Sequence, residues 1–414
     1  MKKLLSHRFE IGIILSLIGT QIAVILYSVF PNWPFDLTNF VFLLSILLVV
    51  DYQQAFTLCI PKHPRIMLWI LGYNIYALFM AVVAGISMFN QNNGLIYTLY
   101  VICFLIAICT NKREFDTDYF ISRFWAVSGI FSILLFYLVT DGFTNISGQT
   151  IGTSLSSGAD RLTLSVIAFM YICVALVYKA KNVFLLVLKV AFAIIAVYDV
   201  MACSRRGLMV ALLIIIAYHF FCIYKGEIRR SSLVRNVLYI IGGIILVVAI
   251  LNIFEPAREM ITLYVERLVL AVNTYVGNTS DGVDAAASAR NTVLNTVPQE
   301  YLSSDILTII FGNGYGYRQL DVPYLQAFTD LGLIGGIWYL IIQFFYPVKA
   351  LIQKPEDDTE RLIKYISIIT MTYNVYSGIP YNHYKFVSLI LLVYVMGMRV
   401  RRETALETWG GGMN

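Results

Sequence analysis

The chain has 414 residues, of which 59% are hydrophobic and 13% charged, and its mean hydropathy is +0.74. A soluble globular domain is nearer half apolar and a quarter charged, so this composition excludes an ordinary soluble domain. The net charge of +5 would suit an acidic partner, but most of it follows from the membrane orientation argued below.

Apolar runs of about 18–22 residues, long enough to cross a bilayer, recur along the chain. The first follows the basic start MKKLLSHRFE. Because no small-residue cleavage site is visible, we expect it to be retained as a span and not removed as a signal peptide. The sequence predicts an all-α polytopic membrane protein with about 12 transmembrane helices, at 11–29, 38–56, 66–88, 94–110, 119–140, 161–178, 183–202, 207–224, 236–253, 329–348, 362–379 and 385–399.

Most of the 30 basic residues fall in connections on one side of this arrangement. Cytoplasmic connections carry the excess of lysine and arginine, so both termini are expected in the cytoplasm. The outer side keeps seven arginines and one lysine: Arg161, Arg205, Arg206, Arg258, Arg267, Arg290, Arg318 and Lys385. Arginine is favoured for binding phosphate or carboxylate, because its planar guanidinium donates two parallel hydrogen bonds. The alternative is that single arginines anchor spans to lipid headgroups.

The longest outer connection covers 254–328, and loops of this length are usually functional. Its residues 257–276 have apolar side chains at helical spacing, which predicts an amphipathic helix lying on the membrane or over the bundle. A short helix over 284–297 and the glycine-punctuated turn FGNGYGY follow. The predicted divisions are spans one to nine (1–253), an outer loop with amphipathic helices (254–328), spans ten to twelve (329–400) and a cytoplasmic tail (401–414).

Two adjacent arginines, Arg205 and Arg206, precede the apolar run GLMVALLIII. They lie at an expected helix N-terminus, where free backbone N–H groups and the helix dipole already favour an anion. The pair therefore suggests a phosphate site. The alternative is an ion pair with Asp199, a costly carboxylate inside the seventh span, which would pin two helices together.

Further candidates face the same side: Asp160 and Arg161 at the start of the sixth span, Arg290 in SARNTVLNTV, Arg318 and Asp321 after FGNGYGY, and His383 between the last two spans. Each of these residues also has a purely structural interpretation. Arg290 could be a solvated arginine, Arg318 and Asp321 a surface ion pair, and His383 a structural histidine. Taken together, arginines from separate segments under one outer loop suggest an anionic headgroup, and a diphosphate needs about this many donors.

Other chemistries lack their motifs. The sequence has no HExxH or other metal-ligand cluster on the outer side, no Walker loop and no GxSxG elbow, so no metal or cofactor is expected. Its six cysteines include no CxxC pair, and we interpret them as packing residues. The energy of any reaction would then come with the substrate, as in a lipid-diphosphate sugar donor.

Several segments resemble a known family. SRRGLMVALLIII is similar to the SRxA-type start of a span in the O-antigen ligase and polymerase superfamily. SARNTVL, FGNGYGY and DVPYLQAFTDLGLIGGIWYL resemble its C-terminal signature, an arginine helix, a GxGxG-like turn and HNxYLQxxxExGxxGxxxF. These motifs cover about residues 204–340, and twelve spans with a dominant late outer loop also match.

The resemblance implies a GT-C-like fold and transfer of a glycan from undecaprenyl diphosphate at the periplasmic face of the bacterial inner membrane. Ligases of the family carry a histidine where HNxYLQ begins. Alignment on Tyr324 puts Asp321 at that position, which favours an O-antigen polymerase (Wzy), a metal-independent glycosyltransferase of lipopolysaccharide biosynthesis.

The resemblance implies that the family's arginines correspond to Arg205 or Arg206 and to Arg290, and that Arg161 matches a basic residue at the sixth span. The full set of roles is a hypothesis drawn from the residues themselves. Arg205, Arg206, Arg318 and Arg161 would hold the donor diphosphate, Arg290 would stabilise it as leaving group, Asp321 or Asp160 would orient or deprotonate the acceptor hydroxyl, and His383 and Tyr324 are possible acceptor-site residues. Expected partners are the undecaprenyl-diphosphate-linked oligosaccharide, membrane lipids and a polysaccharide chain-length regulator. An O-antigen ligase joining polymer to lipid A-core and a lipid-linked oligosaccharide flippase are the alternatives.

Overall fold

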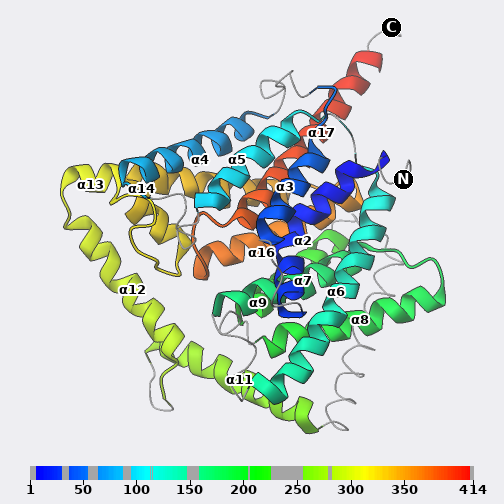
Figure 1. Cartoon of the computed structure of the whole chain (residues 1–414), viewed down its shortest axis with the longest axis horizontal. Coiled ribbons are helices and arrows are strands. Elements are labelled where there is room, and N and C mark those ends of the chain that lie inside the picture. The colour runs from blue at the N-terminus through cyan, green and yellow to red at the C-terminus, as the bar shows by residue number, and fades with distance from the viewer. Residues whose placement is uncertain are drawn as a thin grey trace.

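The computed structural model describes residues 6–29, 37–54, 64–86, 95–111, 113, 115–146, 158–203, 206–224, 255–277 and 282–410. Every regular element in these ranges is a helix. Each predicted span within them coincides with a helix (Figure 1), and the ninth, at 236–253, lies outside the described residues. The bounds are α2 (Arg8–Val29), α3 (Leu37–Val49), α4 (Arg65–Val83), α5 (Leu95–Cys109), α6 (Thr117–Ile146), α7 (Gly158–Val177), α8 (Val183–Ala202), α9 (Arg206–Tyr224), α14 (Pro323–Leu340), α16 (Asp358–Tyr376) and α17 (His383–Gly410).

Five described helical stretches are long and apolar enough to cross a bilayer: Arg8–Leu26, Arg65–Val83, Thr117–Tyr137, Val183–Met201 and Pro323–Ile352. Shorter apolar helices cover Leu37–Val49, Leu95–Cys109, Ser165–Val177 and Gly207–Cys222. The fold is therefore all-helical over the described residues, with five candidate membrane spans. The prediction of twelve goes beyond these five, in part because α16 begins with the charged stretch DTERLIK.

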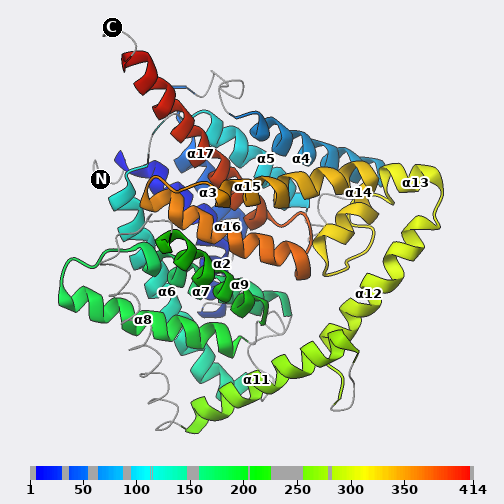
Figure 2. The same ribbon diagram turned by 180° about the vertical axis from the view of Figure 1, so that it is seen from behind.

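The outer loop contains the two predicted helices, α11 (Glu255–Val276) and α12 (Ala285–Leu302), and a third, α13 (Ile306–Phe311). The carboxylate of Asp284 caps α12 by accepting a hydrogen bond from the Ala287 amide at 2.8 Å. Figures 1 and 2 show α11 and α12 running along one side of the bundle to α13, which lies against α14. The loop is thus a folded arm that leads into the α14 segment.

α14 is not a regular helix throughout. It begins at Pro323, a residue suited to the first helical turn, and its backbone leaves helical geometry at Gly332, where φ is 69°. A π-helical turn, η3 (Ile341–Phe345), then connects it to α15 (Tyr346–Ile352). The kink falls where the loop after α13 packs on α14.

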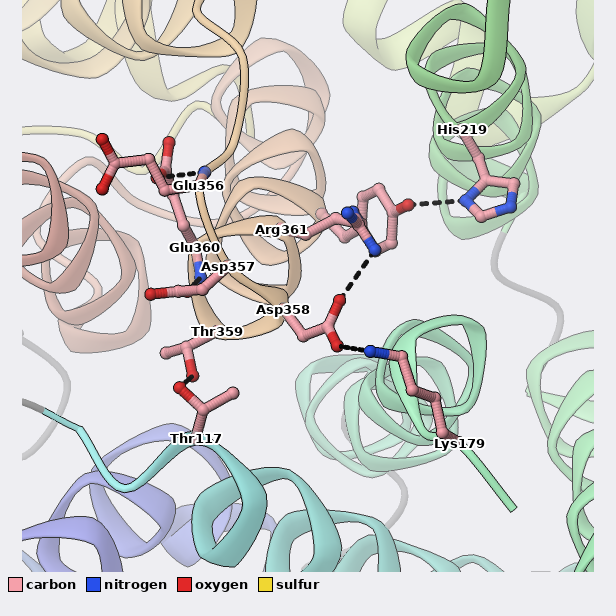
Figure 3. Close-up of polar contacts among 10 residues, drawn as sticks. Thr117, Lys179, His219, Glu356, Asp357, Asp358, Thr359, Glu360 and Arg361 are labelled. Atoms are coloured by element: carbon pink, nitrogen blue, oxygen red, sulfur yellow. Dashed lines mark hydrogen bonds and ion pairs between the residues drawn. The ribbon is translucent and has the colours of Figure 1, made fainter. Parts of the chain in front are cut away.

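The connections that the sequence assigns to the inner side contact one another. The contacts between segments are His7–Asp116, Arg8–Asp51, Asn111–Val49, Tyr394–Arg113, Lys179–Asp358, Thr359–Thr117 and Arg399–Glu356. Figure 3 shows one hub, in which Asp358 accepts hydrogen bonds from both Lys179 and Arg361. The chain start, four connections and the end of α17 therefore share one end of the bundle.

Candidate functional site

A single buried carboxylate organises the segment that carries the FGNGYGY turn. Asp330, on α14, is fully buried. Its Oδ2 accepts hydrogen bonds from the Gln326 amide, the Gly316 backbone N–H and the Tyr381 hydroxyl, each at 3.1 Å. These donors come from α14, the glycine turn and the connection between α16 and α17. One acid therefore holds three separate segments together, and its Oδ1 remains without a partner among the described residues.

Two glycines allow the turn to lie directly on α14. A Cβ on Gly312 would lie 2.4 Å from the Asp330 carbonyl oxygen, and one on Gly332 would lie 2.2 Å from that of Ile310. The Gly314 amide donates to the Asp330 carbonyl at 3.0 Å, and the Asn313 amide donates to the Thr329 carbonyl at 2.8 Å. The backbones approach too closely for any side chain between them.

Tyr315 ties the same turn to the bundle. It is fully buried, its ring stacks on that of Tyr381 with 3.8 Å between centroids, and its hydroxyl lies 2.9 Å from Thr98 Oγ1 of α5. No sequence pattern predicted a structural or functional role for Tyr315. Its burial follows from the positive-φ glycines on either side, Gly314 and Gly316, which fold the chain back onto α14.

Arg318 and Asp321 leave this turn on its exposed side. Arg318 Nη1 pairs with Glu300 Oε2 of α12 at 3.2 Å, and both side chains are more than half exposed. The suggested surface pair of Arg318 with Asp321 is therefore wrong, because the arginine bonds to Glu300. Asp321 is exposed with φ of 55°, a left-handed conformation that aspartate tolerates better than most residues.

Arg290 lies on the face of α12 that turns toward this segment. Arg290, Val293 and Val297 are spaced i, i+3 and i+7, so they share one helix face. Val297 is buried in a small cluster with Leu320, Val322 and Leu325, against which Val293 packs. The Arg290 side chain is half-buried, and its buried Nε has no hydrogen-bond partner among the described residues.

The two proposed acceptor-site residues differ in position. Tyr324 is half-buried beside the same small cluster at the start of α14. His383 is buried inside the bundle, where its ring contacts Phe42 and Tyr97 and its Nε2 lies 3.4 Å from Thr20 Oγ1. His383 is thus surrounded mainly by aromatic rings.

The side chains of four predicted residues lie outside what the structure describes. Arg205 lies outside the described residues altogether. Arg206 begins α9, and Asp160 and Arg161 fall in the first turn of α7, but only the backbone of these three is described. Asp199 is fully buried on α8, and its Oδ2 accepts a hydrogen bond from Ser132 Oγ at 2.9 Å. Its suggested pairing with Arg205 or Arg206 stays a prediction.

One buried lysine was not predicted from the sequence as a site residue. Lys385, in the first turn of α17, is fully buried, and its Nζ donates to the Ser377 carbonyl at 3.0 Å. The sequence held one indication of Lys385: it is the one lysine among the basic residues assigned to the outer side. Asp330 also carried a signal, since a carboxylate within an apolar run is rare and usually has a specific role.

The described residues thus bring Arg318, Asp321 and Tyr324 together around the small cluster, with Asp330 as its internal support. Arg290 lies about two helical turns before Val297 on the same face of α12. Within the described part of the chain, no group of three or more His, Cys, Asp and Glu residues could hold a metal ion. Comparison with protein-family models, with curated proteins and with solved structures gives no match for this chain.

Proposed function

We propose that this chain is an O-antigen polymerase of the bacterial inner membrane, with its reaction at the periplasmic face. It would transfer a growing glycan from undecaprenyl diphosphate to the non-reducing end of a new lipid-linked repeat unit. The proposal rests on the motif resemblance. One structural observation supports it most: the motifs fold as a unit, with the FGNGYGY turn and the YLQAFTDLG helix joined at Asp330 and the arginine helix packed beside them.

In the proposed reaction the acceptor hydroxyl attacks the anomeric carbon of the donor. A new C–O glycosidic bond forms, and the bond from the anomeric carbon to the phosphate oxygen breaks. The diphosphate leaves with that electron pair, and the hydroxyl proton passes to Asp321 or Asp160. Arg290 would stabilise the charge that develops on the leaving group, together with Arg318 and the sequence-derived Arg161, Arg205 and Arg206.

The unsatisfied Nε of Arg290 favours a ligand role for that residue. A buried donor without a partner costs about 1–3 kcal/mol, and an anionic ligand would remove that cost. Arg318 is already paired with Glu300, but in an exposed pair that contributes about 1 kcal/mol or less. A phosphate could therefore compete for Arg318 at little expense.

The proposed orientation agrees with the end-to-end arrangement of charge. The predicted cytoplasmic connections meet at one end of the bundle, through the contacts of Asp358, Asp51 and Asp116. The turn that bears Arg318 and Asp321 makes its contacts with α12, α14 and the connection before α17, which the sequence assigns to the opposite face.

The polymerase is preferred over the ligase because of the residue before YLQ. Asp321 stands where the ligases are expected to have a histidine, and His383 is enclosed by aromatic rings and not placed on the exposed turn. Among the described residues around the FGNGYGY turn, no exposed histidine is present that could act as the base of a ligase-type mechanism.

The test is complementation of a strain from which the gene has been deleted. Loss of the long-chain lipopolysaccharide ladder that leaves core plus one repeat unit is expected, and the intact gene should restore the ladder. Loss that leaves bare core would identify a ligase instead, and failure to expose the lipid-linked unit at the periplasmic face would identify a flippase.

Variants then test the site. Arg290→Ala is expected to abolish the ladder at equal protein level. Arg65→Ala is the matched control, because Arg65 is an exposed arginine at the start of α4 on the predicted cytoplasmic side. Normal ladders from Arg290→Ala would remove Arg290 from the site.

A further inference from the structure

The buried ammonium of Lys385 lacks a carboxylate partner. Its Nζ forms no ion pair with any described residue, and a lysine has three N–H donors, of which the Ser377 carbonyl takes one. The sole described carboxylate whose charge acts on it is Asp321, which is exposed to solvent. A buried charge without a counter-ion is strongly unfavourable.

Three polar groups converge beside Gly378, the positive-φ residue that follows α16. A Cβ at Gly378 would lie 2.8 Å from Asn382 Nδ2, 3.7 Å from the Tyr384 hydroxyl and 4.0 Å from Lys385 Nζ. Gly378, Asn382 and Tyr384 are each half-buried. Together with Lys385, these residues place three polar groups around one side of Gly378. We call this arrangement the Gly378 niche.

The helices around the niche have opposite effects on its charge. Ser377 is the C-cap of α16, so the Lys385 ammonium is stabilised by the negative end of that helix dipole. The same ammonium lies in the first turn of α17, where the free N–H groups add positive charge. The C-terminal end of α16 is therefore the one helix end that offsets the positive charge of Lys385, and most of that charge remains uncompensated.

We propose that the Gly378 niche binds a phosphate oxygen of the lipid diphosphate, with Lys385 as its ammonium donor and Asn382 as its amide donor. This deepens the proposed function and rests on it for the identity of the lipid. The alternative is that Lys385 only caps α16.

Binding measurements on the full-length protein in nanodiscs of zwitterionic lipid separate these roles. The probe is undecaprenyl diphosphate, and its dissociation constant is measured by native mass spectrometry. Lys385→Gln can still donate to Ser377 but carries no charge. It is expected to weaken binding by about tenfold or more, the effect of losing one charge-assisted hydrogen bond. Unchanged affinity in Lys385→Gln would reduce Lys385 to a helix cap and overturn the proposal.

A second variant and a matched control guard against indirect effects. Lys385→Met removes charge and donor together and should weaken binding at least as much. Lys349→Met, at an exposed lysine of α15, should leave it unchanged. Asp321→Asn removes the nearby negative charge and should strengthen binding or leave it unchanged. Weaker binding in Asp321→Asn would contradict the assignment of the niche to an anion.

Two further probes identify the source of the phosphate. Phosphatidylglycerol and inorganic diphosphate are measured against the same variants. Dependence on Lys385 that is confined to the isoprenoid diphosphate supports the substrate assignment. Equal dependence for phosphatidylglycerol or inorganic diphosphate would overturn it. Failure of the intact gene to restore the ladder, with binding still dependent on Lys385, would refute the polymerase while leaving the niche intact.

Discussion

At the scale of single residues, the buried carboxylate of Asp330 links three segments of the chain by hydrogen bonds. Its Oδ2 accepts three hydrogen bonds from three parts of the chain. The donors on Gln326 and Tyr381 would be left buried if the acceptor disappeared, and an unsatisfied buried donor costs about 1–3 kcal/mol. The position of the turn that bears Arg318 and Asp321 therefore depends on a residue that lies inside the fold.

Replacement of Asp330 tests this dependence. Asp330→Ala removes the acceptor of all three bonds, two of them from buried donors, and should lower the free energy of unfolding by about 2 kcal/mol or more. Asp330→Asn keeps one amide oxygen of similar shape and should lose less. Thermal unfolding in detergent and limited proteolysis within 312–322 measure the two effects. An alanine variant as stable and as protease-resistant as the parent would show that the turn is held by other contacts.

At the scale of elements, the packing of α13 on α14 depends on the close approach of two backbone stretches. Gly332 has positive φ, and its missing Cβ leaves room for the Ile310 carbonyl. Gly316 also has positive φ, but nothing lies within 4 Å of the place where its Cβ would be. Gly316 thus requires glycine only for its positive φ, whereas Gly332 also requires it because a Cβ would collide with the backbone of Ile310.

Gly332→Ala and Gly316→Ala form a matched pair. Both should bear a backbone cost of about 1–3 kcal/mol, because side-chain-bearing residues rarely adopt positive φ. Gly332 also has ψ of −172°, a conformation that only glycine adopts readily. Gly332→Ala should be clearly more destabilising, because its Cβ would meet backbone and not a movable side chain. The difference in thermal unfolding midpoint between the two variants measures the collision together with the greater backbone strain at Gly332. Equal midpoints would mean that α13 and α14 can separate without loss.

The start of α13 gives a pH-dependent prediction outside the spans. The Asp305 carboxylate accepts hydrogen bonds from the Thr308 hydroxyl at 2.7 Å and from the amides of Thr308 and Leu307 at 3.0 Å. The Thr308 hydroxyl, followed by these amides, lowers the pKa of Asp305. A lowered folded-state pKa stabilises the fold above the unfolded-state pKa, about 3.9, and this contribution is lost as pH falls through the folded-state value.

Asp305→Asn should therefore be less stable than the parent at neutral pH. The difference should shrink as pH falls below about 4, where the parent carboxylate becomes protonated and resembles the amide. Unfolding midpoints of both proteins across pH 3–7 test this. A difference that stays constant over that range would show that the cap acts without its charge.

At the scale of the whole molecule, the sequence predicted the helices well because apolar length and helical spacing are local properties. α11 and α12 appear where the pattern of 257–276 and 284–297 placed them. The sequence did not predict which residues meet. Tyr315, Asp330 and Tyr381 are far apart in the chain and come together through backbone turns at glycines, which no periodicity reports.

The candidate site was predictable only in part, for a similar reason. Charge asymmetry singled out Arg290 and Arg318 as residue types, but the pairing of Arg318 with Glu300 depends on how the turn packs on α12. Lys385 and Asp330 went unassigned because each is a single charge in an apolar context. Their importance comes from burial, which a one-dimensional pattern does not give.

The meeting of the basic connections at one end predicts a simple topology. Lys179, in the connection after α7, contacts Asp358 at the start of α16, and its side chain is 82% exposed. Arg318 is 52% exposed on the turn assigned to the other face. If the bundle spans the membrane as the charge distribution predicts, these two positions lie on opposite sides of the bilayer.

Cysteine labelling with a membrane-impermeant maleimide tests that arrangement. In a background whose native cysteines are replaced, Arg318→Cys should react in intact spheroplasts and Lys179→Cys only in inverted vesicles. Neither change should unfold the protein, because exposed ion pairs contribute about 1 kcal/mol or less. Detergent-solubilised protein, in which both cysteines should react, is the control for accessibility. Labelling of both variants from the same side of the intact membrane would refute the topology, and with it the placement of a periplasmic site at the turn of Arg318.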